Sequence, residues 1–456
     1  MAIAAGIFRQ YDIRGIVDAD LTTEAARAIG QAYAANLAER GLSGAIAVGR
    51  DNRPSGPKLR DALVDGLASA GVDVIDIGVV PTPLNYWALH HLPVIGGIQI
   101  TGSHNPPEYN GFKLSLEKGS LHGDEIQHLY QLTQHPDART TKRGSVRDEA
   151  IIDRYIDDIV QRIGKLSRRI RAVYDCGNGA GSLVASTLFS RLGLEGRGLF
   201  CDSDGTFPNH HPDPTVPENL EDLIGAVRAD GAEIGIAFDG DADRIGVVDG
   251  EGRIIWGDRI LILYARDVLE RTGRGQPIIF DVKCSQALPM AVENAGGVPV
   301  MWRTGHSLIK EKMREMHAPI AGEMSGHMFF SEGFYGHDDA LYGAARLLRI
   351  LADSGRTVAQ LLADVPDFTS TPELRIEVPE EIKFSLVERA VQHFRKHHDV
   401  IDVDGVRVLF GDGWGLIRAS NTQPILVTRF EALSEARLAE IRAEMEGWLR
   451  GQGVSV

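Results

Sequence analysis

Short apolar runs alternate along this chain with longer stretches whose apolar spacing is typical of helices. Three times, an apolar run ending in polar residues or glycine is followed by a helix-like stretch, a glycine and a second apolar run. The paired runs are 45–51 with 71–77, 171–177 with 193–199, and 277–283 with 297–301. A strand, helix, strand unit of this kind builds parallel α/β sheets. The repeat predicts three similar α/β domains with mixed sheets.

From about Pro366 the pattern changes to strand, helix, several strands and a final amphipathic helix over 435–450. This order predicts a smaller α+β domain at the C-terminal end. The 456 residues exceed what one hydrophobic core supports, since domains average about 150 residues. A Pro/Ser/Thr-rich junction at 365–372 predicts a hinge before the last domain. We therefore expect four domains, at residues 1–149, 150–253, 254–365 and 366–456.

A turn at residues 101–107, with the sequence Thr-Gly-Ser-His-Asn-Pro-Pro, presents a serine hydroxyl group. The two prolines and the Asn-Pro step prevent helix formation, and the apolar residues 95–100 predict a short buried strand before the turn. Ser103 then lies just past a strand end, where open α/β sheets place their chemistry. Serine is also common in purely structural turns. The turn alone leaves both a nucleophile and a structural serine open.

Three carboxylates alternate along the segment 239–243, between two apolar runs that predict strands. A tight loop there brings together Asp239, Asp241 and Asp243. Carboxylates this close repel one another without a cation, and Mg²⁺ accepts a few of them while phosphate or water completes its octahedron. An EF-hand does not fit, because its sixth position requires glycine where this chain has Arg244. The segment predicts a magnesium site, with a solvated acidic loop as the alternative.

Two further segments carry groups that suit a phosphorylated sugar. Residues 418–424, Arg-Ala-Ser-Asn-Thr-Gln-Pro, combine a guanidinium with hydroxyl and amide donors that match phosphate oxygens. Residues 322–327, Gly-Glu-Met-Ser-Gly-His, place an acid, a hydroxyl and an imidazole where neighbouring sugar hydroxyls can be bound. An ordinary polar loop and a structural histidine are the alternatives. The candidate ligands are Glu323, Ser325, His327, Arg418, Ser420, Asn421 and Thr422.

Composition narrows the classes of partner. The chain has 48 basic and 63 acidic residues and a net charge of −15, which argues against nonspecific nucleic-acid binding. An anionic substrate must then be attracted by a local basic cleft. Cys176, Cys201 and Cys284 are widely spaced, which predicts packing residues in a reducing compartment. We find no signal-peptide pattern and no apolar run long enough to cross a bilayer, so we expect a cytoplasmic protein without a membrane partner.

The motifs resemble those of the α-D-phosphohexomutase family, most closely its bacterial phosphomannomutase/phosphoglucomutase branch. The resemblance implies an isomerase-class phosphotransferase with four domains around one central cleft. Only Ala242 and Gln423 depart from the family pattern, and neither change removes a donor or a ligand. The similar segments follow the family's order and cover nearly the whole chain, at residues 8–15, 101–107, 110–113, 239–244, 281–283, 304–307, 322–327 and 418–424.

The resemblance implies that Ser103 carries a phosphoryl group and donates it to a hexose phosphate. The resulting 1,6-bisphosphate turns over in the cleft and returns its other phosphate, and glucose 1,6-bisphosphate acts as an activator. By resemblance, Mg²⁺ is held by Ser103 and the three aspartates, and Glu323 and Ser325 read the sugar's 3- and 4-hydroxyls while His327 reaches a phosphate or a hydroxyl. The resemblance also implies that Arg14, Lys113, Arg244 and His306 serve in proton transfer or charge stabilisation. It further implies a set of residues that hold the distal phosphate: Tyr11, Lys283, Arg418, Ser420, Asn421 and Thr422.

Three alternatives stay open at this point. Phosphoglucosamine mutase is the nearest, although Met324 resembles the mannose/glucose branch, where the glucosamine branch has glutamine. A phosphatase results if water reaches phosphoserine. A sugar-phosphate sensor is the third alternative, although it would need neither Ser103 nor the three aspartates. The expected substrates are the 1- and 6-phosphates of mannose and glucose, without a ranking between these epimers, and the close branch suggests a monomer.

Overall fold

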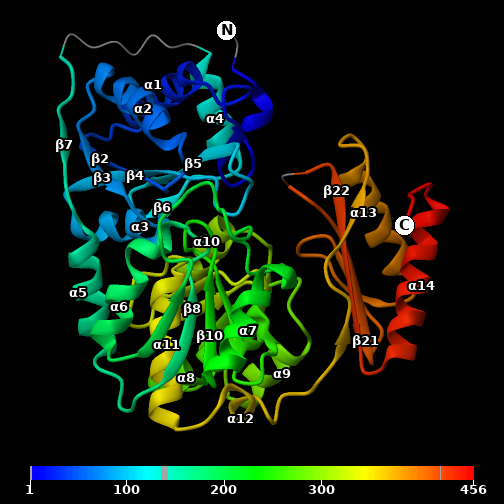
Figure 1. Cartoon of the computed structure of the whole chain (residues 1–456). Helices are drawn as coiled ribbons and strands as arrows, with labels where there is room; N and C mark the ends of the chain where they lie inside the picture. Colours follow the sequence, from blue (N-terminus) through cyan, green and yellow to red (C-terminus); the bar gives the residue numbers. More distant parts are fainter. Residues whose placement is uncertain (1–2, 135–141, 422) are drawn as a thin grey trace.

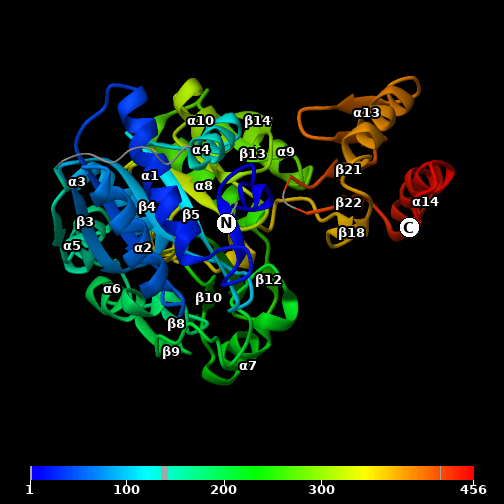
Figure 2. The ribbon, with the colours of Figure 1, turned by 90° about the horizontal axis from the view of Figure 1, so that it is seen from above.

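A computed structural model describes residues 3–134, 142–421 and 423–456, and in this part of the chain the strands form four sheets. Each sheet is built from one continuous section of the sequence. Three sheets with their helices form one body, coloured blue to yellow in Figure 1, and the fourth, orange to red, lies beside it in both views (Figure 1, Figure 2). The predicted fold class, three mixed α/β domains and a smaller α+β domain, is confirmed.

The first sheet has the strand order β1-β5-β4-β2-β3-β7, with β6 paired to β5. Strands β4, β2, β3 and β7 run parallel, whereas β5 is antiparallel to its neighbours. The strands are β1 (Ile13–Ile16), β2 (Ala45–Arg50), β3 (Val74–Val79), β4 (Val94–Ile100), β5 (Tyr109–Leu116), β6 (Gly119–Ser120) and β7 (Val146–Asp148). The helices are η1 (Ala5–Ile7), α1 (Thr23–Glu39), α2 (Gly56–Ser69), α3 (Thr82–His91) and α4 (Asp124–Thr133).

The second sheet has the order β12-β11-β10-β8-β9. Its strands are β8 (Arg171–Asp175), β9 (Glu195–Leu199), β10 (Ile234–Phe238), β11 (Ile245–Asp249) and β12 (Ile254–Ile255). Its helices are α5 (Ile152–Ile163), η2 (Ala180–Leu183), α6 (Ala185–Leu192), η3 (Pro217–Leu220) and α7 (Glu221–Asp230). Strand β12 follows the expected boundary at residue 253 and still pairs with β11 of this sheet.

The third sheet, in the order β14-β13-β15-β16, repeats the design. Its strands are β13 (Pro277–Asp281), β14 (Val298–Trp302), β15 (Ile320–Gly322) and β16 (Met328–Phe330). Its helices are α8 (Gly257–Thr272), α9 (Ala287–Asn294), α10 (His306–Met316), α11 (Ala340–Ser354) and α12 (Val358–Leu361). The pairs β2/β3, β8/β9 and β13/β14 are all parallel and enclose a helix, which confirms the predicted threefold unit.

The fourth sheet is antiparallel throughout, in the order β17-β22-β21-β20-β19, with β18 paired to β22. Its strands are β17 (Thr369–Ser370), β18 (Leu374–Glu377), β19 (Asp399–Ile401), β20 (Val406–Leu409), β21 (Gly413–Ala419) and β22 (Ile425–Ala432). Two helices, α13 (Lys383–Phe394) and α14 (Glu435–Gly451), pack on this sheet. The predicted final helix over 435–450 is confirmed.

Separate apolar clusters, among them one that the first domain buries on its own, account for the shape in Figure 1. One apolar cluster joins the first three domains and includes Trp87, Tyr155 and Leu348, whereas the C-terminal domain buries its own cluster around Phe430 and Met445. Apolar residues buried together keep elements together, so the first three domains form one unit. Within the described residues, no helix is both long and apolar enough to span a bilayer.

Candidate active site

Ser103 lies just past the carboxyl end of β4, as predicted. Its backbone has a φ of +49°, a conformation that a non-glycine residue keeps only where its surroundings fix it. Arg53 supplies that support, because its buried guanidinium donates to the carbonyls of Ser103 at 2.8 Å and Asn105 at 2.6 Å. The same group also reaches the carbonyls of Pro106 and Tyr109. The turn is therefore held rigidly with its hydroxyl in place.

The three predicted aspartates lie in the loop between β10 and β11, and none is exposed to solvent. Their ligand oxygens lie within 4.8 Å of one another. Ala242 has a φ of +58° at the tip of the loop, and Asp239 Oδ1 accepts from the backbone N–H of Asp243 at 3.0 Å. Ser103 Oγ donates to Asp239 Oδ2 at 3.0 Å. The serine turn and the aspartate loop, which are far apart in the sequence, thus lie in contact.

Other polar groups satisfy part of this acidic cluster. Lys113, on β5, lies 2.9 Å from Asp241 and also pairs with Asp243. The hydroxyls of Thr82 and Thr101 donate to Asp241 Oδ2 at 2.5 and 3.1 Å. Asp241 Oδ1 is buried and, among the described residues, has no hydrogen-bond partner. A buried oxygen left free among three carboxylates fits a hard cation such as Mg²⁺.

Burial and neighbouring charges shift the pKa values of Asp239 and Asp243 in opposite directions. Burial, together with the neighbouring Asp243 and Asp241, raises the pKa of Asp239 well above its usual value. Burial also acts to raise the pKa of Asp243, but Lys113 and His327 outweigh it and hold that pKa well below the usual value. An added positive charge between these carboxylates would relieve their mutual repulsion.

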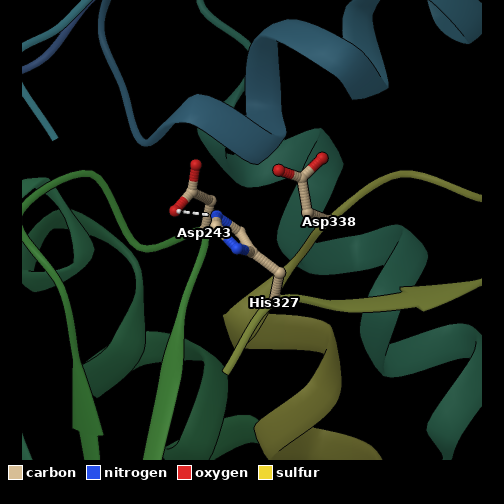
Figure 3. Close-up of side chains that lie close together, drawn as sticks. All are labelled: Asp243, His327 and Asp338. Carbon is tan, nitrogen blue, oxygen red and sulfur yellow. Dashed lines mark ion pairs between the residues drawn. The ribbon is translucent and has the colours of Figure 1, made fainter. Parts of the chain in front are cut away.

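His327 connects the aspartate loop to the predicted sugar-binding segment. Its imidazole lies 3.2 Å from Asp243 and 2.7 Å from Glu323, and Figure 3 shows the ring directed toward the Asp243 carboxylate. Burial lowers the pKa of His327, but the two carboxylates outweigh it and raise the pKa to about 9. Ser325 Oγ lies 3.1 Å from His327 Nδ1, and Arg244 Nε lies 3.4 Å from Nε2. The predicted residues of segments 239–244 and 322–327 therefore meet.

Asp338, also drawn in Figure 3, is a neighbour that the sequence pattern did not reveal. Together with Asp243 and His327 it forms a second group whose ligand atoms lie close together. Lys310 already pairs with Asp338 at 2.9 Å, so this carboxylate has a counter-charge and we assign no second metal. His306, at the start of α10, lies 3.8 Å from Asp338. Burial and Lys310 lower the pKa of His306 well below its usual value, which keeps the imidazole neutral.

Tyr11 and Asn421 meet although they lie at opposite ends of the chain. Asn421 Nδ2 donates to Tyr11 OH at 2.7 Å, and Tyr11 OH donates to the Thr304 carbonyl at 2.8 Å. Burial raises the pKa of Tyr11 to about 12, so the hydroxyl stays protonated. Arg14, on β1, pairs with Asp12 and donates to Asn105 Oδ1, both at 2.5 Å, which places it beside the serine turn.

The remaining predicted phosphate ligands lie at the border of the third and fourth domains. Arg418 Nε pairs with Asp404 at 2.6 Å, and Lys283 Nζ pairs with Glu373 at 2.6 Å. Ser420 is buried in the same loop, whereas Thr422 lies outside the described residues. Asp404 and Glu373 were not predicted, because acidic residues are frequent in loops and only the fold shows that these two face cations.

The loop before α10 joins the two groups of side chains. The Gly305 N–H donates to Glu323 Oε1 at 2.6 Å, while the carbonyl of the preceding residue accepts from Tyr11. This N–H and His327 outweigh the effect of burial and lower the pKa of Glu323 to about 2. The serine turn, the aspartate loop, the Glu323 segment and the loop after β21 are therefore linked by a chain of hydrogen bonds and ion pairs, to which each sheet contributes.

Comparison with known proteins agrees with this geometry. Four family models of phosphoglucomutase/phosphomannomutase match the chain in order: alpha/beta/alpha domain I at residues 5–140, domain II at 153–252, domain III at 256–368 and the C-terminal domain at 373–447. The matches follow the four sheets, except that the short strands β7, β12 and β17 fall in the gaps between neighbouring matches.

Curated relatives match this chain over nearly its full length. A phosphomannomutase/phosphoglucomutase of Pseudomonas putida is 48% identical over 97% of this chain and 95% of the relative. A phosphoglucomutase of Neisseria gonorrhoeae is 47% identical over 97% and 96%. The crystal structure of a phosphoglucomutase/phosphomannomutase family protein from Burkholderia thailandensis superposes with a TM-score of 0.91 at 46% identity, covering 98% of both chains. With its serine turn, aspartate loop and four-domain fold in the same order, this chain belongs to the phosphoglucomutase/phosphomannomutase family of the α-D-phosphohexomutases.

Proposed function

We propose that this protein interconverts hexose 1-phosphates and hexose 6-phosphates of mannose and glucose, through a phosphoserine at position 103 and a 1,6-bisphosphate intermediate. The observation that carries the proposal is the contact between Ser103 Oγ and a fully buried cluster of three aspartates. A site that only bound sugar phosphate would need neither a constrained hydroxyl nor a buried acidic cluster. Relatives at nearly half identity with mutase names support the same conclusion.

The chemistry at the serine is mainly charge neutralisation and positioning. Asp239, Asp241, Asp243 and an oxygen on Ser103 would hold Mg²⁺, which supplies positive charge beside the transferred phosphoryl group. Lys113 and Arg244 add fixed positive charge around the same loop. Arg14 and His306 are the proposed groups for charge stabilisation or proton transfer near the serine.

The sugar must be bound in two opposite orientations while its distal phosphate stays in one place. We assign that phosphate to Tyr11, Lys283, Arg418 and the loop residues Ser420, Asn421 and Thr422. Asp404 and Glu373 keep Arg418 and Lys283 in position, with both cations buried and charged. In either orientation, Glu323 and Ser325 contact the 3- and 4-hydroxyls of the sugar, and His327 reaches a hydroxyl or a phosphate.

Five further points complete the proposal. The domains divide at about residues 149, 255 and 365, the enzyme acts as a monomer in the cytoplasm, and its cofactor is Mg²⁺. Glucose 1,6-bisphosphate activates it, because a sugar bisphosphate can restore phosphate to a serine that has lost it.

The first experiment follows three substrates, mannose 1-phosphate, glucose 1-phosphate and glucosamine 1-phosphate, by phosphorus NMR. Each is incubated with the protein, Mg²⁺ and a catalytic amount of glucose 1,6-bisphosphate. We expect the first two to become 6-phosphates. Rapid conversion of glucosamine 1-phosphate alone would indicate a phosphoglucosamine mutase, inorganic phosphate as the main product a phosphatase, and no reaction a sugar-phosphate sensor.

A further inference from the structure

Two of the three cysteines meet at the ends of neighbouring strands in the second domain. Cys176 directly follows β8 and Cys201 closely follows β9, and their sulfur atoms lie 3.2 Å apart. Backbone hydrogen bonds from Cys176 N to Leu199 O at 3.1 Å and from Asn178 N to Phe200 O at 2.8 Å keep the two segments together beyond the strands. Parallel strands are about 4.8 Å apart, within the range of Cα separations that a disulfide spans.

The local backbone makes room for this pair. A Cβ atom at Gly198 would lie 2.5 Å from Cys201 Sγ, so the thiol occupies space that a side chain on β9 would fill. Phe200 has a φ of +49°, and this turn returns the chain so that Cys201 lies over the end of the sheet. The missing side chain at Gly198 and the positive φ of Phe200 thus keep the two sulfur atoms next to each other.

The two thiols differ in access and in acidity. Cys176 is fully buried, whereas Cys201 is partly exposed. The hydrogen bond between the two sulfurs lowers the pKa of Cys201 and, together with burial, raises that of Cys176. Cys284 is the contrasting case, since it is buried beside Asp281 at 3.0 Å and burial raises its pKa. An accessible sulfur that ionises more readily, beside a buried second thiol, is the arrangement of an attacking and a resolving cysteine.

We propose that Cys176 and Cys201 form a redox-active dithiol that closes to a disulfide when the protein meets a peroxide. The Cys201 thiolate attacks one oxygen of hydrogen peroxide, which breaks the O–O bond, releases hydroxide and leaves a sulfenic acid. The Cys176 sulfur then attacks the Cys201 sulfur, so an S–S bond forms while the S–O bond breaks and water leaves. In total, two thiols are oxidised, one peroxide is reduced and two waters form. The sulfurs need to approach by only about 1 Å to reach the ~2.05 Å of a disulfide.

The position of the pair connects it to the aspartate loop. Cys176 opens a short segment in which Gly179 N donates to the Cys176 carbonyl at 2.8 Å, and Ala180 N donates to the Gly240 carbonyl at 2.9 Å. Gly240 lies between Asp239 and Asp241. Movement of the sulfur atoms therefore acts on the backbone that supports the three carboxylates.

The test uses the full-length protein, treated with hydrogen peroxide, alkylated under denaturing conditions and analysed by intact and peptide mass spectrometry. We expect Cys176 and Cys201 to lose their reactivity together, with a loss of about two mass units and a crosslinked peptide pair. Cys284 should remain alkylatable, and dithiothreitol should restore all three thiols. The readout is a bond within the polypeptide, so it does not depend on which reaction the enzyme catalyses.

Two matched variants make the result specific. Cys201→Ser should abolish the crosslink and leave Cys176 as a free thiol after the same treatment, whereas Cys284→Ser should form the crosslink as the unaltered protein does. Oxidation of Cys201 to a sulfinic acid without a crosslink would overturn the proposal, and so would equal loss of all three thiols. Disulfide-linked dimers in place of the internal bond would overturn it as well.

Discussion

At the scale of single residues, Lys113 shows how the site manages its charge. Its ammonium group pairs with Asp241 and Asp243, and both carboxylates raise the pKa of Lys113 well above its usual value against the effect of burial. Buried carboxylates require a partner, and here the protein supplies one of its own. A bound cation must share these oxygens with Lys113. The loop therefore keeps a counter-charge when the cation dissociates.

Replacing Ser103 with alanine should preserve the fold and abolish turnover. The Ser103 hydroxyl bonds to Asp239 and His104, and Asp239 keeps its bond from the Asp243 N–H, so little stability depends on the hydroxyl. The loss of the nucleophile should lower kcat at least about a thousandfold, measured with Mg²⁺ and glucose 1,6-bisphosphate present. The control Ser69→Ala, on α2, should be fully active. A Ser103→Ala enzyme that still converts substrate would refute the phosphoserine assignment.

Asp241→Asn should weaken Mg²⁺ binding at least about tenfold, because it removes one of the charges that attract the cation. The contacts of Asp241 with Thr82, Thr101 and Lys113 all reach one oxygen, Oδ2, and the amide oxygen can keep them, so the fold should survive. Calorimetric titration of the chelator-treated protein with MgCl₂ measures the effect directly. Asp230→Asn, at the protein surface, serves as the control. Equal Mg²⁺ affinity and equal activity in the two variants would rule out Asp241 as a ligand.

Candidate site residues can be named from the sequence where they stand in compact motifs. Ser103 and the three aspartates are four such residues, and the structure brings them together. Arg53, Thr82 and Thr101 could not be predicted, because each supports the site through contacts across the fold. A threonine or an arginine outside a motif carries no sign in the sequence of what it will touch.

At the scale of elements, the serine turn and the aspartate loop touch backbone to backbone at Gly240. A Cβ atom there would lie 2.4 Å from the Ser103 carbonyl oxygen, so alanine must push the two segments apart. We expect Gly240→Ala to lower the free energy of unfolding by about 1–3 kcal/mol, as overpacking does, and to reduce turnover. Urea denaturation and the mutase assay measure both effects.

Gly225 on α7 is the matched control for this substitution, because a Cβ atom there meets nothing within 4 Å. Gly225→Ala should leave activity unchanged and stabilise the protein by up to about 1 kcal/mol through helix propensity. If both alanine variants behaved alike, close contact between the two segments would not be the reason for glycine at position 240.

His90, at the end of α3, should make stability depend on pH. It stacks on Tyr335 at 4.5 Å between ring centres, and burial, with His337 nearby, lowers its pKa from 6.5 to about 4. The unfolded chain thus binds this proton more readily than the folded protein. Stability present above pH 6.5 is therefore lost as the pH falls toward 4, and the slope of the unfolding free energy against pH corresponds to at most about one bound proton. His90→Asn should flatten this part of a plot of unfolding free energy against pH. A parallel curve for the variant would assign the acid sensitivity to other groups.

Elements with a strong pattern were predicted closely, and very short ones were not. The apolar run 234–238 coincides with β10, and 245–248 falls one residue short of β11. Strands β7, β12 and β17 escaped prediction because two or three residues carry too little alternation to stand out, and β7 is exposed along its whole length. Such strands form because a neighbouring strand offers unpaired backbone groups, which is a property of the assembled sheet.

At the scale of the whole molecule, the C-terminal domain is expected to close on the substrate. It carries Arg418 and Asn421, which have to reach a phosphate held against the other domains, and it has its own core. Small-angle X-ray scattering should show a smaller radius of gyration when a sugar bisphosphate is added. Arg418→Ala should reduce this change at the same ligand concentration. Identical profiles with and without ligand would count against a hinge at residues 365–372.

The border between the third and fourth domains has a consequence for how the chain can be divided. Arg407 is fully buried there and donates to the carbonyls of Val282 at 2.8 Å and Cys284 at 2.6 Å, while Trp414 packs against Val282. Cutting the polypeptide after Asp367 would separate two pieces that each keep a complete sheet and an apolar core. Each piece would also expose a surface whose polar and apolar groups are complementary to those of the other piece. The two fragments, produced separately and mixed, should therefore reassemble by complementation, with this arginine as the contact that selects the partner.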